Sequence, residues 1–149
     1  MKRQVAADWV EAPLKAFVDD SRVRIAVLLH PTGQVLGQFG FMRSVDVVTA
    51  CALSAAIHAS AGELGRMLDG RPFEVLHYAG ATHQLFLGPV PVPGGTLLLL
   101  SVFDEETSFG LVQIYFKEFC AAVARVAPEW CGADTALATD FEAELNRNL

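Results

Sequence analysis

The chain has 149 residues, of which 52% are apolar and 19% are charged, and its 17 acidic and 11 basic side chains give a formal net charge of −6. This length predicts one domain with a full hydrophobic core, and the composition excludes an intrinsically disordered chain. The acidic balance, without a basic cluster, argues against a nucleic-acid partner. The apolar content exceeds the usual ~45–50% and must belong to a membrane segment, a core or an interface.

The longest stretch without a formal charge, from Val75 to Phe103, is long enough to cross a membrane. Four glycines and three prolines interrupt it, so it cannot form the continuous apolar helix that a membrane span requires. Near the N-terminus, Asp8 and Glu11 precede any apolar run of the length found in signal peptides. We therefore expect a cytoplasmic protein without a membrane span.

The first half of the chain predicts a helix, a hairpin and a long helix. Residues 8–20 carry a helical apolar stripe, although Pro13 predicts that this helix starts or kinks there. The β-branched run 23–29 and the weaker strand 34–39 flank a Pro-Thr-Gly turn and predict a hairpin. From 45 to 68 the chain is rich in alanine and free of proline, which predicts the longest helix, ended by Asp-Gly and Pro72.

The second half predicts a hairpin of residues 73–78 and 84–87, a loop over 89–95, and a strand over 96–103 that is apolar on both faces. Residues 104–108 supply negative charge and capping side chains for a helix that extends to about Val126. After a loop over 128–138, Thr139 and Glu142 match a capping box that opens a short helix. Its apolar stripe consists of Phe141, Leu145 and Leu149.

The predicted fold class is α+β. Short hairpin connections favour a mostly antiparallel sheet of five strands, and helices cover it. The strands 23–29 and 96–103 are apolar enough to lie in its centre, because central strands are buried on both faces.

The helix over 45–68 has two apolar faces. One face carries the larger side chains, Leu53, Ile57, Leu64 and Leu68 together with Ser60, and we expect it to lie on the sheet. The opposite face consists of Val48, Cys51, Ala52, Ala55, His58, Ala59 and Gly62. A second apolar face needs a cover, which is either another protein chain or a loop or tail of the same chain. We expect another protein chain, because small side chains let a second backbone approach closely.

Several segments resemble the Roadblock/LC7 superfamily and follow one another in the same order. They are the turn Thr32-Gly33-Gln34-Val35-Leu36, the pair Val45-Asp46 that opens the alanine-rich helix, and above all Phe103-Asp104-Glu105-Glu106-Thr107-Ser108-Phe109-Gly110-Leu111-Val112. Within the superfamily, the chain is most similar to the MglB-type bacterial regulators of cell polarity and gliding motility. The resemblance covers residues 8–126 as one domain, and residues 127–149 form a tail.

The resemblance implies an αββαβββα domain with a five-stranded antiparallel sheet, helices on both faces, and an additional tail helix. It implies a homodimer in which the third strands pair and the long second helices lie side by side. It also implies a GTPase-activating role toward the GTP-bound form of an MglA-like small Ras-family GTPase, which binds across these helices. The partner-binding residues would then be Val48, Cys51, Ala52, Ala55, His58, Ala59, Gly62 and Arg66, with a weaker tail contact through Phe141, Leu145 and Leu149.

We expect no catalytic site in the chain itself. It has neither a phosphate-binding GxxxxGK[ST] loop nor a GxSxG nucleophile motif. Arg66 and Arg43 are the nearest candidates for an arginine supplied to the GTPase, but solvated arginines are common at helix ends and MglB-type proteins reposition the GTPase's own groups. The carboxylates of Asp104, Glu105 and Glu106 are explained by helix capping.

We also expect no metal or cofactor. His77 and His83 flank a predicted turn without a third ligand. His58 is expected to be an interface histidine, although a titrating switch there is an alternative. Cys51, Cys120 and Cys131 form no CxxC pair and are expected to be reduced.

The sequence therefore predicts a homodimeric regulator of a small GTPase. The alternatives are a Roadblock scaffold that binds its partner regardless of nucleotide, and a sensor of small ligands that needs no protein partner.

Overall fold

The computed structural model describes residues 8–43 and 45–129 of the chain. The elements follow in the predicted order. They are α1 (Asp8–Ser21), β1 (Ile25–Leu29), β2 (Val35–Gly40), α2 (Val47–Asp69), β3 (Leu76–Ala79), β4 (Gln84–Val92), β5 (Gly95–Phe103) and α3 (Phe109–Val126). The predicted helix from Thr139 lies outside the described residues.

The five strands form one antiparallel sheet in the order β2-β1-β5-β4-β3. The two strands that the sequence predicts as central, β1 and β5, lie side by side in its middle. All five residues of β1 are buried. The α+β class and the antiparallel sheet are thus confirmed. The sheet leaves β2 and β3 as its two edges, which matters for the candidate site.

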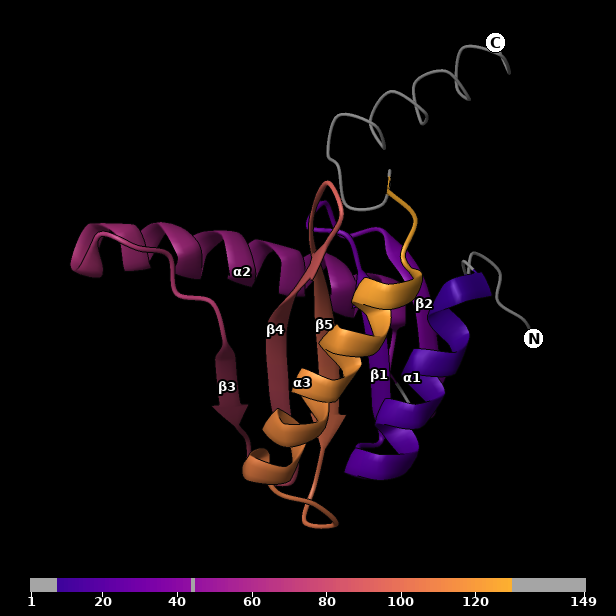
Figure 1. The fold of residues 1–149 in the computed structure, drawn as a ribbon. Helices are drawn as coiled ribbons and strands as arrows, with labels where there is room; N and C mark the ends of the chain where they lie inside the picture. The colour runs from indigo at the N-terminus through magenta and orange to yellow at the C-terminus, as the bar shows by residue number, and fades with distance from the viewer. Residues whose placement is uncertain (1–7, 44, 130–149) are drawn as a thin grey trace, which may run out of the picture.

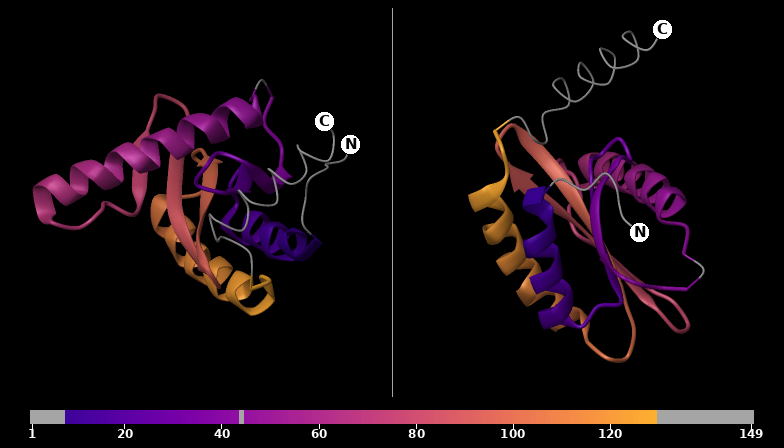
Figure 2. Two further views of the ribbon diagram at one scale, coloured as in Figure 1. Left: turned by 90° about the horizontal axis from the view of Figure 1, so that it is seen from above. Right: turned by 90° about the vertical axis from the view of Figure 1, so that its right-hand side faces the viewer.

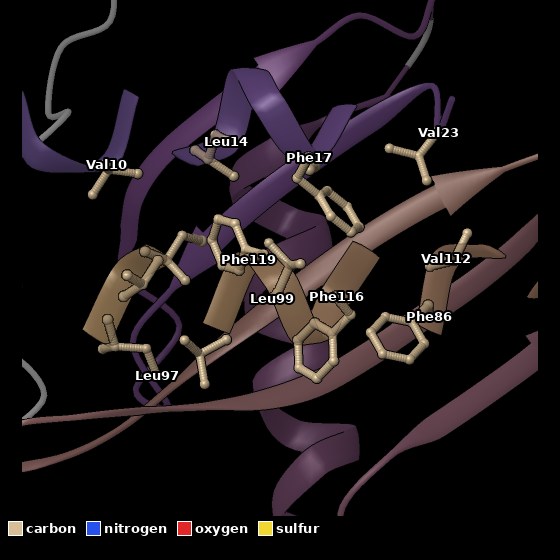
Figure 3. Packing of buried hydrophobic residues seen from close by; sticks show 14 of the residues in the cluster. Val10, Leu14, Phe17, Val23, Phe86, Leu97, Leu99, Val112, Phe116 and Phe119 are labelled. Atoms are coloured by element: carbon tan, nitrogen blue, oxygen red, sulfur yellow. The ribbon is translucent and has the colours of Figure 1, made fainter. Parts of the chain in front are cut away.

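Helices cover both faces of the sheet (Figures 1 and 2). On one face, α1 and α3 pack over a core that includes Leu28, Phe86 and Leu99, and Figure 3 shows the rings of Phe17, Phe86, Phe116 and Phe119 in this layer. On the other face, α2 covers a smaller core that includes Val27, Leu29, Leu87, Leu98 and Leu100. Successive residues of β1 and β5 alternate between the two cores, because side chains alternate along a strand.

The structure decides between the two alternatives left open at Pro13 and corrects the expectation for the prolines after residue 88. Pro13 lies inside α1, which begins at Asp8, so the helix does not start at the proline. Strand β4 continues to Val92, whereas the sequence predicts a loop from residue 89. Pro89 and Pro91 are tolerated there because only one side of the strand is affected. They are two residues apart, so the two positions without a backbone N–H lie on the same side of β4. Strand β3 pairs only with residues 84–87, so that side of β4 has no neighbour from residue 88 onward.

The expectation that residues 104–108 cap a helix is confirmed for Ser108 and wrong for Asp104. Ser108 is the N-cap of α3, and its hydroxyl accepts a hydrogen bond from the Leu111 N–H at 3.2 Å. The Asp104 carboxylate instead accepts hydrogen bonds from the Glu106 N–H at 3.0 Å and from Arg24 Nε at 2.6 Å. These bonds lower the pKa of Asp104, with the backbone bond as the main cause. Asp104 therefore ties the loop before α3 to the start of β1.

Candidate protein-interaction site

The long helix α2 has well-formed ends. At its N-terminus, the Asp46 carboxylate accepts hydrogen bonds from the Thr49 hydroxyl at 2.7 Å and from the Thr49 N–H at 3.2 Å. Both bonds lower the pKa of Asp46. At the C-terminus, Gly70 adopts a left-handed conformation with φ of 77°, and its N–H donates to the Arg66 carbonyl at 3.0 Å. The whole span of 23 residues is therefore a single helix that extends beyond the edge strand β3 (Figure 1).

The orientation expected for α2 is wrong. The face with small side chains lies on the sheet, where Cys51 is 0% and Ala55 is 8% exposed. The face with large side chains points outward, and Leu53 is 59% and Leu64 is 49% exposed. The physical reason is the sheet beneath, whose leucines, isoleucine and valines already fill this layer, so that the helix backbone comes close only through small side chains.

The residues expected to bind a partner are therefore divided. Cys51, Ala55 and Gly62 are buried within the protomer and cannot form an external surface. His58 is half-buried. The remaining four, Val48, Ala52, Ala59 and Arg66, are exposed along one flank of α2.

The segment after α2 packs against the C-terminal half of the helix. A Cβ atom on Gly65 would lie 2.3 Å from the Phe73 nitrogen and 2.7 Å from the Arg71 carbonyl oxygen. Gly62 faces Pro72 with more room. The absence of a side chain at Gly65 thus lets residues 71–73 lie directly on α2, and these residues lead into β3.

A cavity of about 470 Å³ lies on the exposed flank, between α2, residues 72–74 and the Pro89 end of β4. It is lined by His58, Ala59 and Arg66, among others. Burial lowers the pKa of His58, and the negative charge of Glu74 opposes this shift. Nδ1 of His58 is buried and has no hydrogen-bond partner in the part of the chain that the structure describes. The guanidinium of Arg66 is bonded to Glu63 at 3.1 Å and remains exposed.

The opposite flank of α2 forms an apolar groove beside the edge of the sheet. It is about 370 Å³ in volume and combines Leu53, Ile57 and Leu64 with Tyr78 of β3. Strand β3 pairs with β4 on one side only, so the backbone groups on its other side are available for pairing. An apolar helix face and an open strand edge therefore adjoin, and both features favour association with another chain.

The two histidines of the hairpin contact other side chains. His77 stacks on Phe109, with 4.0 Å between ring centroids, and its Nε2 contacts Gln84 Oε1 at 2.7 Å. His83 Nδ1 instead contacts the Thr82 hydroxyl at 3.0 Å. Among residues 8–43 and 45–129, no group of three potential metal ligands is found. The two described cysteines, Cys51 and Cys120, are free, and burial raises the pKa of each thiol to about 11.

The membrane question concerns α2 rather than the stretch from Val75 to Phe103, which forms strands. By length and composition alone, α2 is the one helix within the described ranges that could cross a membrane, a test that core helices of soluble proteins also pass. Cys51 and Ala55 of this helix pack against the sheet of its own protomer. The apolar composition of α2 is therefore weak evidence for a membrane span.

Comparison with solved structures identifies the architecture. MglB from Myxococcus xanthus has a TM-score of 0.71 at 23% identity, covering 78% of this chain and 93% of that chain. The gliding protein MglB from Thermus thermophilus has a TM-score of 0.69 at 23% identity, covering 85% of this chain and 98% of that chain. A Roadblock/LC7 domain from Streptomyces avermitilis has a TM-score of 0.65 at 19% identity, covering 79% and 94%. The chain has the Roadblock/LC7 fold. No protein-family model and no curated protein matches the sequence.

Reasoning from sequence predicted the two apolar faces of α2 but assigned the large side chains to the sheet, whereas Leu53 and Leu64 are exposed. It also did not predict that Tyr78 of β3 lines the groove beside these residues. Both faces of α2 are apolar, so periodicity alone does not tell which face is covered. A usable signal was side-chain size, since the central strands carry bulky residues that leave space only for a helix face of small ones.

Proposed function

We propose that this protein is a homodimeric regulator that binds the GTP-bound form of an MglA-like small GTPase and accelerates GTP hydrolysis in the cytoplasm. The observation that carries the proposal is the outer surface of α2. One flank is an apolar groove continuous with the open edge of β3, and the other exposes Val48, Ala52, Ala59 and Arg66. The first flank suits a second copy of the chain, and the second flank is left for the GTPase.

The fold match to MglB proteins supports this choice of partner, and the description of one of them as a gliding protein supports a role in motility or polarity. The chain offers the GTPase a surface rather than a reactive group. Arg66, which lies on the GTPase flank, already pairs with Glu63. We therefore propose that activation repositions the catalytic groups of the GTPase itself.

The test mixes the protein with an MglA-like GTPase and measures complex formation and phosphate release. Ala59→Arg is expected to abolish both, because a long charged side chain would be placed against the partner at a close helix contact. Ala12→Arg, on the exposed side of α1, is the matched control and is expected to leave both unchanged. Arg66→Ala is expected to retain most of the activation.

The outcomes separate this function from its alternatives. Full binding by Ala59→Arg would contradict the assigned flank, and loss of activation with intact binding in Arg66→Ala would show that an arginine is supplied in trans. Binding that is equally tight to the GDP-bound and GTP-bound GTPase would favour a scaffold. A rise in melting temperature with a small ligand alone would favour a sensor.

A further inference from the structure

A second groove lies on the opposite face of the molecule, between α1 and α3. Its volume is about 310 Å³. The rings of Phe17 and Phe119, with 5.7 Å between their centroids, line it together with Pro13, Ala16, Ala121 and Ala122. The alanines keep the space between the two helices open. The groove is mainly apolar, and neither α2 nor the edge strand β3 takes part in it.

The groove begins where the chain leaves α3. Arg125, the penultimate residue of α3, lines one end of the groove, and Asp20 and Glu118 lie farther along it. Figure 1 shows that the C-terminal end of α3 lies beside the N-terminal end of α1. Arg125 forms no ion pair within residues 8–43 and 45–129. The residues after α3 therefore start at an apolar groove whose nearest charge is the cation of Arg125.

We propose that residues 139–149 of the same chain dock as an amphipathic helix in this groove. These residues lie outside the described part of the chain, and their sequence predicts a helix with Phe141, Leu145 and Leu149 on one face. That stripe extends about 12 Å at ~1.5 Å per residue, and by the same rise the groove follows α3 for about 15 Å from Tyr115 to Arg125. The lengths match.

The direction of the chain and the charges agree with this placement. The connection over 128–138 is long enough for the chain to turn back, so the segment would run antiparallel to α3. Its first residues would then lie nearest to Arg125, and Asp140, Glu142 and Glu144 make this beginning acidic. Ala143 and Arg147 lie on the side opposite the stripe and would face solvent.

The test measures amide hydrogen exchange of residues 139–149 in the full chain, without any GTPase. A helix of this length is marginal in water by itself, so slow exchange reports docking. We expect Leu145→Asp and Ala121→Asp to accelerate exchange by about tenfold or more, and Arg125→Glu to accelerate it less. Ala121 lies in the groove and is exposed, so its substitution tests the groove without changing the docked segment.

Two matched controls introduce the same charge elsewhere. Ala143→Asp lies on the solvent side of the segment, and Ala124→Asp lies on α3 outside the groove. Both are expected to preserve slow exchange. Fast exchange in the unmodified chain, or slow exchange that survives Ala121→Asp, would overturn the proposal.

A mixture of two variants distinguishes docking within one chain from docking onto a second copy. The Leu145→Asp chain has an intact groove, and the Ala121→Asp chain has an intact segment. If docking occurs within one chain, mixing them restores no protection. Restored protection in the mixture would overturn the assignment to the same chain and show exchange of the segment between copies. Because the GTPase is absent, this result is independent of the proposed function.

Discussion

The pKa of His58 on α2 depends on both the burial of its side chain and a neighbouring charge. Its imidazole lines the cavity on the flank of α2 that carries Ala59 and Arg66, and burial holds its pKa below the usual 6.5 while Glu74 acts in the opposite direction. A histidine whose pKa is lower in the folded than in the unfolded state stabilises the fold above the unfolded pKa. This contribution is lost as the pH falls through the folded pKa, because the unfolded chain then binds more protons.

We expect Glu74→Gln to lower the pKa of His58 further, because it removes the negative charge that favours the imidazolium. The pKa can be read from the imidazole proton shifts of His58 in an NMR titration. Glu118→Gln, on α3 across the sheet, serves as the control and is expected to leave the titration unchanged. A pKa of His58 that is above 6.5, or that does not respond to Glu74→Gln, would contradict this account.

Single residues were also where prediction from sequence was weakest. The acidic run after β5 has the composition of a helix start, and Ser108 does cap α3. The bond from Arg24 to Asp104 joins residues 80 positions apart in the chain. No local pattern contains that information, because the pair forms only when the sheet brings β1 beside β5.

At the scale of elements, the packing of residues 71–73 on α2 depends on the absence of a side chain at Gly65. Replacing glycine by alanine inside a helix normally stabilises it by about 0.8–1.0 kcal/mol. At Gly62 the new Cβ would lie 3.7 Å from Pro72, an ordinary contact. At Gly65 it would collide with the Phe73 and Arg71 backbone, which has no flexible end to move away.

We therefore expect Gly62→Ala and Gly65→Ala to change stability in opposite directions. Gly62→Ala should raise the midpoint of urea unfolding, and Gly65→Ala should lower it by more than the helix propensity gains. Each variant is the other's control, since both place the same methyl group on the same helix. A rise in the midpoint for Gly65→Ala would mean that residues 71–73 are not held against α2.

The order of helices and strands was predictable because apolar periodicity and turn residues are local. The C-terminal extent of β4 was not, because prolines normally end a strand, and their tolerance here depends on where β3 stops. The orientation of α2 was not predictable from periodicity, since both of its faces are apolar. Its small residues suggest a surface for another chain, whereas in the structure Cys51 and Ala55 fit the helix to its own sheet and Gly62 is buried within the protomer.

At the scale of the whole molecule, the apolar excess is distributed over two cores and an outer surface. The two layers around the sheet account for the leucines, valines and phenylalanines of β1, β5 and α1. The outward face of α2, beside Tyr78, is not covered by any described part of the protomer. A second copy of the chain, as proposed above, would bury it.

We expect Leu64→Asp to convert a dimer into a monomer. Leu64 is 49% exposed in the protomer, so a charge costs little in the monomer but would be buried without a partner between two copies of α2. Light scattering after size-exclusion chromatography at micromolar concentration measures the mass. Leu111→Asp is the control, because Leu111 is similarly exposed, at 45%, on α3 across the sheet.

A monomeric mass for the unmodified protein, or a dimer that tolerates Leu64→Asp, would contradict the assignment of this flank to self-association. Dissociation by both substitutions would instead indicate a contact between copies that involves α3.

The two prolines of β4 have a consequence for the protomer before it finds a partner. An exposed sheet edge recruits other strands and can start aggregation. Pro89 and Pro91 remove two N–H donors from the uncovered side of β4, so the pairing edge there is confined to the four residues of β3. Newly synthesised chains would thus present a short template, long enough for a matched copy to align and too short to favour indiscriminate growth into fibrils.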